Sequence, residues 1–139
     1  MVLVLNPREV RFAGQVWEDV SAVVVDRHAQ RKVTEWSDLG PQVVLVDAPE
    51  QLVTVRVVQQ VARDDVGTPV PGDSGELSFF TAPSGSDTPR RRVVIECVVT
   101  DATHELSIKN GAVRTVKLVA VSSDGIVDPV SIEDADGMG

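Results

Sequence analysis

The stretch Arg-Arg-Val-Val-Ile-Glu-Cys-Val-Val-Thr at residues 91–100 indicates the fold most clearly. From residue 93 onward its alternate positions are apolar, and they are Val93, Ile95, Cys97 and Val99. Side chains with a period of two lie on one face of a β-strand. We therefore predict a strand whose apolar face lies in a core.

The same alternation recurs on both sides of this stretch. We predict clear strands at residues 16–25, 51–62, 75–81 and 112–122, and weaker strands at residues 9–13, 33–36, 42–46 and 127–132. Asn110-Gly111 predicts a tight hairpin turn, because both positions accept positive φ. No segment has a helical apolar stripe, so any helix is expected to be short, near residues 27–32 or 48–51.

The composition agrees with an all-β fold. The chain has 139 residues, of which 42% are hydrophobic and only 4% aromatic, and valine occurs 29 times. Valine suits a pleated sheet and is stiff in a helix. We expect a single domain over residues 1–139, an antiparallel β-sandwich or small barrel with at most one short helix.

Several classes of protein are excluded or disfavoured by composition. Cys97 is the single cysteine, so no internal disulfide is possible. No apolar run is long enough to span a membrane, and the first residues do not resemble a signal peptide. The net charge of −8 disfavours tight binding to a phosphate backbone or to an anionic membrane surface.

No pattern in the sequence indicates an active site. His28 and His104 are far apart and lack the spacing of a metal site, and Cys97 lies within an apolar strand face. The acidic stretch around Asp64 and Asp65 does not match an EF-hand, and no glycine-rich phosphate loop is present. We therefore predict a protein that is not an enzyme and that carries no cofactor or metal.

Two features indicate self-association. The second faces of the long strands are partly apolar, with Val58, Val94, Val98, Val119 and Val121 on them. Such faces are typical of strands covered by another subunit or by a folded-back arm. Within residues 1–7, the apolar run Val2, Leu3, Val4 and Leu5 is a candidate arm that either adds an edge strand to a neighbour or packs on its own domain.

Charge is unevenly distributed along the chain. Residues 124–139 form an acidic C-terminal segment without Lys or Arg, whereas Arg90, Arg91 and Arg92 form a basic triplet. This triplet either protects an aggregation-prone strand or meets an acidic patch on the next subunit. A repeating head-to-tail contact of the second kind generates rings or filaments.

Several segments resemble the tail tube proteins of long-tailed phages. They are Asp47-Ala48-Pro49-Glu50-Gln51 before a valine-rich strand, Gly75-Glu76-Leu77-Ser78-Phe79, Cys97-Val98-Val99, Leu106-Ser107-Ile108-Lys109, the strand from Arg114 to Val121, Ser122-Ser123-Asp124-Gly125, and Asp128-Pro129-Val130. The resemblance implies a β-sandwich in homohexameric rings that stack into a hollow tube. Long loops and a terminal arm would bind the next ring, and sheath, baseplate or terminator proteins would be further partners.

The resemblance also implies a place and a passive role. The protein would be made in the bacterial cytoplasm, would not insert into a membrane, and would form part of the virion tail. Genomic DNA would pass through an acidic lumen, for which Glu96, Asp64, Asp65 and Glu76 are the candidate lining residues. Other ring-forming parts of a tail or injection machine remain an alternative, and a ligand-binding β-sandwich or a small enzyme is a more distant one.

Overall fold

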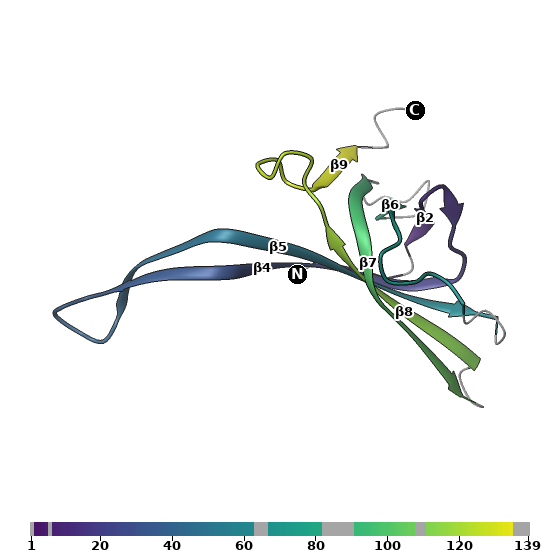
Figure 1. Ribbon diagram of the computed structural model, residues 1–139, viewed down its shortest axis with the longest axis horizontal. Helices are drawn as coiled ribbons and strands as arrows, with labels where there is room; N and C mark the ends of the chain where they lie inside the picture. The colour runs from purple at the N-terminus through teal and green to yellow at the C-terminus, as the bar shows by residue number, and fades with distance from the viewer. Residues whose placement is uncertain (1, 6, 63–66, 82–90, 108–110, 135–139) are drawn as a thin grey trace.

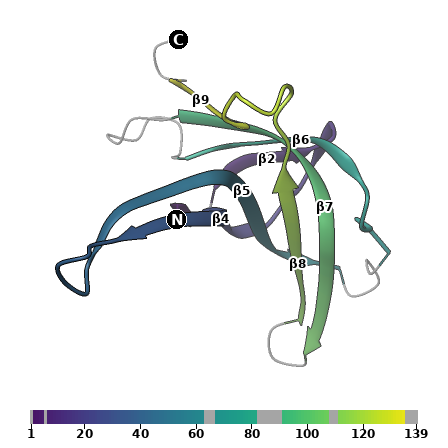
Figure 2. The same cartoon turned by 60° about the vertical axis from the view of Figure 1, so that its left-hand side comes forward.

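The computed structural model describes residues 2–5, 7–62, 67–81, 91–107 and 111–134 (Figures 1 and 2). Within these ranges the protein is all-β and contains no helix, as predicted. The nine strands are β1 (Val2–Leu5), β2 (Arg8–Phe12), β3 (Gln15–Val16), β4 (Val20–Trp36), β5 (Val43–Val61), β6 (Ser74–Phe80), β7 (Arg91–Ser107), β8 (Gly111–Ala120) and β9 (Val130–Asp134).

All nine strands belong to one antiparallel sheet in the order β1-β4-β5-β8-β7-β6-β2-β3, with β9 paired to β7. β7 is the central strand. Its first half lies between β6 and β9, and its second half pairs with β8. The end strands β1 and β3 do not pair with each other, so the sheet is not closed into a barrel.

The sheet bends over on itself and encloses one core, which gives a sandwich-like body (Figure 2). The alternating residues of β7 are buried as predicted, and they meet Val55 and Val57 of β5, Leu77 and Phe79 of β6, and Leu118 of β8 in a single cluster. Valine is stiff at χ1 and packs well on a pleated surface, which is why a valine-rich chain builds this core without many aromatic residues.

β6 and the turn between β2 and β3 approach each other very closely. The amide of Ala13 donates to the carbonyl of Glu76 over 3.1 Å, and a Cβ on Gly75 would lie 2.7 Å from the Cβ of Ala13. Only glycine fits at this position of β6. Gly75 therefore allows the β2–β3 turn to pack directly against β6 and to cover this end of the core.

β4 and β5 extend far beyond the body as a two-stranded hairpin (Figure 1). Their paired residues run from Val20↔Gln59 inside the body to Trp36↔Val43 near the tip. Burial ends at Val25 on β4 and at Val53 on β5. We call residues 27–52 the arm.

Some sequence predictions need correction. Neither of the two locations suggested for a possible short helix, residues 27–32 and 48–51, is helical, because both segments are paired strands of the arm. The weak strands at residues 33–36 and 42–46 are the distal ends of β4 and β5 rather than separate elements. β7 and β8 form the predicted hairpin, but Gly111 begins β8 opposite Ser107 and so does not lie in a two-residue turn; Asn110 lies outside the described residues.

Candidate assembly surface

The arm exposes large apolar side chains near its tip. Trp36, Val44 and Val46 are 62%, 65% and 60% exposed, and Leu39 in the tip loop is almost fully exposed. The tip is closed by a backbone hydrogen bond from Ser37 to Gln42 of 3.0 Å. A two-stranded hairpin is at best marginally stable alone in water, so an extended arm of this kind is expected to be covered by another surface.

Both faces of the distal arm are apolar. The register places Val33 opposite Asp47 and Glu35 opposite Leu45 on one face, with Thr34 opposite Val46 on the other. By alternation up to the register shift between Glu35 and Trp36, face one contains Val33, Glu35, Leu45 and Asp47, and face two contains Thr34, Trp36, Val44 and Val46, with Val43 directly opposite Trp36 beyond the shift. The two faces differ in charge, because the two carboxylates lie on face one.

Ion pairs fix the root of the arm. Both guanidinium nitrogens of Arg27 contact the carboxylate of Asp128 in the β8–β9 connection, at 3.1 and 3.0 Å. Asp128 also accepts a hydrogen bond from the amide of Val130, and the Arg27 guanidinium holds the pKa of Asp128 below its ordinary value. Farther out, Arg31 pairs with Glu50 across the hairpin at 3.6 Å.

The β8–β9 connection is a well-organised loop over the root of the arm (Figure 1). The carboxylate of Asp124 accepts hydrogen bonds from the amides of Ile126 and Val127 at 2.8 and 2.9 Å. These bonds to the ionised form lower the pKa of Asp124. The loop thereby presents two apolar side chains to solvent, with Ile126 90% exposed.

Two of the predicted lumen acids lie together on the outer face of the sheet. Glu76 of β6 and Glu96 of β7 are directly opposite each other, and both are exposed. Arg92 approaches the carboxylates of Glu76 and Glu133 at 3.8 and 3.9 Å. The other two candidates, Asp64 and Asp65, lie outside the described residues, as does Arg90.

The other predicted contact residues occupy two edges of the body. Val2, Leu3, Val4 and Leu5 form β1, which pairs with β4 of the same chain, and Val4 is buried in the core. Within one chain the segment therefore packs on its own domain, and its predicted contact with a neighbouring subunit stays a prediction. Arg91 and Arg92 begin β7, where β9 pairs with it.

The partly apolar outer face is present as predicted. Val58, Val94, Val98 and Val119 are half-buried on it, and Val121 is exposed just after β8. Between Val24, Arg56 and Lys117 this face has a shallow hollow of about 300 Å³. The structure of one chain thus leaves this face available for contacts.

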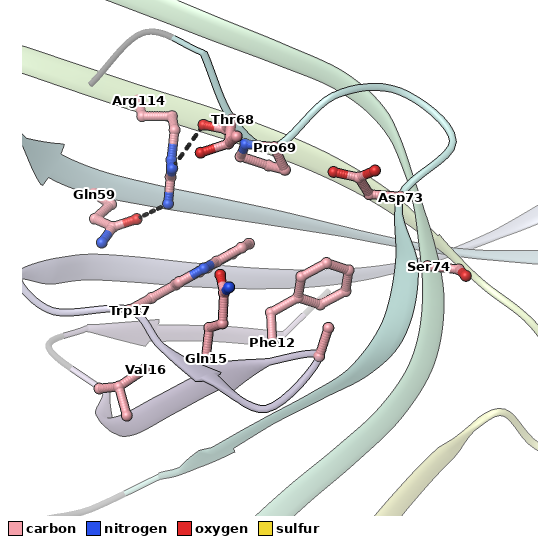
Figure 3. A pocket seen from close by; sticks show the side chains of 11 residues that line it. Phe12, Gln15, Val16, Trp17, Gln59, Thr68, Pro69, Asp73, Ser74 and Arg114 are labelled. Atoms are coloured by element: carbon pink, nitrogen blue, oxygen red, sulfur yellow. Dashed lines mark hydrogen bonds between the residues drawn. The ribbon is translucent and has the colours of Figure 1, made fainter. Parts of the chain in front are cut away.

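A hollow of about 550 Å³ lies between the β2–β3 turn and residues 68–74 (Figure 3). The buried guanidinium of Arg114 lies 4.9 Å above the ring of Trp17, and it donates to the carbonyl of Thr68 at 2.8 Å and to the side chain of Gln59. Gln59 in turn donates to the carbonyl of Glu18 at 2.6 Å. These contacts connect β8, β5 and two loops, so we interpret this site as structural.

The titratable side chains singled out in the sequence lie in different environments, since His28 is exposed beside Asp26 at 3.3 Å and Thr54 at 3.4 Å, whereas Cys97 is buried in the core. Burial raises the pKa of the Cys97 thiol to about 12, which keeps it protonated and unreactive. Among the described residues, no three His, Cys, Asp or Glu side chains form a cluster suited to a metal ion. Nor do these residues include a helix able to cross a bilayer.

The arm is the structural element that sequence reasoning missed. Its signal was present in the sequence, because two weak strands flank the turn formers Gly40 and Pro41. Each weak strand is separated from a strong strand by a polar stretch, and that polarity is what argued for a loop or helix instead. Comparison with known proteins adds no identification, since no protein-family model and no curated protein matches the chain.

Proposed function

We propose that this protein is a structural subunit that assembles with copies of itself into the hollow tail tube of a long-tailed phage. The two-sided apolar arm is the observation that carries the proposal. The body already has a closed core, whereas the arm extends away from it with large apolar side chains in solvent. Such a surface is typical of a protein–protein contact.

The arrangement favours an assembly that repeats. The arm and the surfaces of the body are different patches on the same chain, so an arm that binds another copy leaves its own body free to bind the next arm. Heterologous contacts of this kind close into rings or continue as filaments. A stack of rings combines both outcomes, because contacts close within each ring and continue from one ring to the next. This agrees with the resemblance of the sequence to phage tail tube proteins.

The proposed role of the tube is to conduct DNA without binding it. A hexameric ring would carry a formal charge of −48, six times the −8 of one chain. Glu76 and Glu96 are exposed on the same face of the sheet, and although Arg92 lies 3.8 Å from the Glu76 carboxylate, the two carboxylates outnumber this cation on a surface proposed to repel phosphates. Under this proposal the chain performs no chemical step and acts through its shape and charge.

Electron microscopy of the purified full-length chain tests the proposal. We expect hollow rods for the native protein. Val44→Asp combined with Val46→Asp should raise the concentration needed for assembly at least about 100-fold, because burying unpaired carboxylates costs several kcal/mol. The matched control, Val44→Ile with Val46→Ile, keeps the apolar surface and should still assemble.

The variants also separate assembly from folding. The aspartate variant should unfold in one cooperative urea transition, because residues 44 and 46 lie outside the core. A native protein that stays monomeric at high concentration would contradict the proposal. Single rings that never stack would instead indicate a terminator-like component.

A further inference from the structure

A second apolar surface lies on the body, in the segment from Val121 to Asp134. We call this the β8–β9 segment. Ile126, Val127 and Ile132 are exposed along it. The hydrogen bonds that Asp124 accepts hold the loop in one conformation, and Asp128 attaches it to Arg27. The segment therefore presents apolar side chains on an ordered backbone.

The β8–β9 segment is strongly acidic. Its sequence contains Asp124, Asp128, Glu133 and Asp134, and it has no Lys or Arg. Asp128 is paired with Arg27, and Arg92 approaches Glu133 at 3.9 Å. Asp124 keeps a lowered pKa and stays ionised at neutral pH. A surface that docks here without electrostatic cost must be apolar and free of carboxylates.

Face two of the arm has these properties. Trp36, Val44 and Val46 are its large side chains, and the carboxylates of the distal arm, Glu35 and Asp47, lie on face one. Lys32 lies at the bulge just before Val33 and adds a positive charge near this end of the arm. Face one would place two carboxylates against the acidic segment, so charge selects face two.

We propose that face two of the arm of one copy docks on the β8–β9 segment of the next copy. This inference rests on the self-assembly proposed above and names the two surfaces that meet. Figures 1 and 2 show the β8–β9 connection over the root of the arm, far from its tip. One chain cannot bring its own two surfaces together in this arrangement, so the contact requires two copies.

Cysteine cross-linking tests this contact. Val44→Cys in one preparation and Ile126→Cys in another, distinguished by tags of different size, are mixed during assembly and treated with a short bis-maleimide. Native Cys97 does not interfere, because it is buried and its thiol remains protonated. We expect a covalent dimer that contains one chain of each preparation.

The matched control places the cysteine on the opposite face of the same arm. The control variant is Val33→Cys. The native Val33 side chain is 46% exposed and lies on face one. Its yield of dimer with Ile126→Cys should be several-fold lower than that of Val44→Cys. An equal or higher yield would overturn the choice of face two.

Micrographs of the same samples separate the two proposals. Rods without a Val44→Cys cross-link to Ile126→Cys would overturn this docking contact and leave the proposed tube intact. The absence of any assembly would contradict both. As a second measurement, Ile126→Asp should prevent rods while leaving the urea midpoint unchanged, because Ile126 is outside the core; rods from this variant would count against the contact.

Discussion

Arg114 is a charged residue on a strand face that is otherwise apolar. Its neighbours on the inner face of β8 are Ala112, Val116 and Leu118. These three side chains and that of Arg114 are buried. A buried guanidinium is tolerated only when its donors find acceptors, and here Thr68 and Gln59 supply them while Trp17 covers the charge. One residue thus connects two strands to the loop at residues 67–73.

Arg114→Met tests this role. The variant keeps an unbranched apolar stem but removes the donors to Thr68 and Gln59, so we expect a loss of about 2–4 kcal/mol of unfolding free energy. The measurement is the urea midpoint at fixed protein concentration. Lys117→Met on the exposed face of the same strand is the control and should change the midpoint little. Equal midpoints for the two variants would show that the contacts of Arg114 are not stabilising.

The arm begins at an ion pair whose effect on pH dependence is predictable. Because Arg27 lowers the folded-state pKa of Asp128, the pair stabilises the attachment above the unfolded pKa of about 4. This stabilisation is lost as the pH falls through the lower folded pKa. Both side chains are about half exposed, so the pair contributes at most about 1 kcal/mol.

Titration of Asp128 by NMR in a non-assembling variant measures this effect directly. Arg27→Ala should return the pKa of Asp128 toward its ordinary value, because the first cause of the shift is removed. Arg31→Ala is the matched control, since Arg31 pairs with Glu50 instead. If Arg27→Ala leaves the titration of Asp128 unchanged, the ion pair does not fix the arm root in solution.

Strands that contribute to the core were predictable from the sequence, and the arm was not. Residues 91–100 alternate because each inward side chain must be apolar, so period and burial carry the same information. In the arm, the period of the apolar residues no longer reports which side chains are buried. Arg31 pairs with Glu50 across the hairpin, and Arg27 pairs with Asp128 of the β8–β9 connection, all in solvent, so polarity there follows neither face and resembles a loop. Arg114 was missed because a buried charge depends on partners distant in sequence.

At the scale of the whole molecule, one chain divides into a closed body and an open arm. The Val-rich sandwich of β-strands would be complete without residues 27–52, since burial stops at Val25 and Val53. The arm therefore adds exposed apolar surface without adding to the core. Under the proposed self-assembly, other copies would cover this surface and stabilise the arm, which would link folding of the arm to assembly.

The proposed conduction of DNA gives a prediction for the assembled tube. Glu76 and Glu96 lie side by side, so Glu76→Lys with Glu96→Lys replaces a repelling pair by two cations at every subunit. We expect tubes of normal appearance, because both side chains are exposed and outside the core. Release of DNA from particles with this tube should slow at least about tenfold at low salt, because phosphates would bind the added cations.

The neutral variant Glu76→Gln with Glu96→Gln separates loss of repulsion from gain of attraction. Its rate of DNA release should lie between the rates of the native protein and of the lysine variant. Added salt should reduce the difference, since screening acts within about 8 Å at physiological ionic strength. Equal release rates for all three proteins would show that these two carboxylates do not line the DNA path. Slowed release that is insensitive to salt would instead indicate a change in the shape of the tube rather than in its charge.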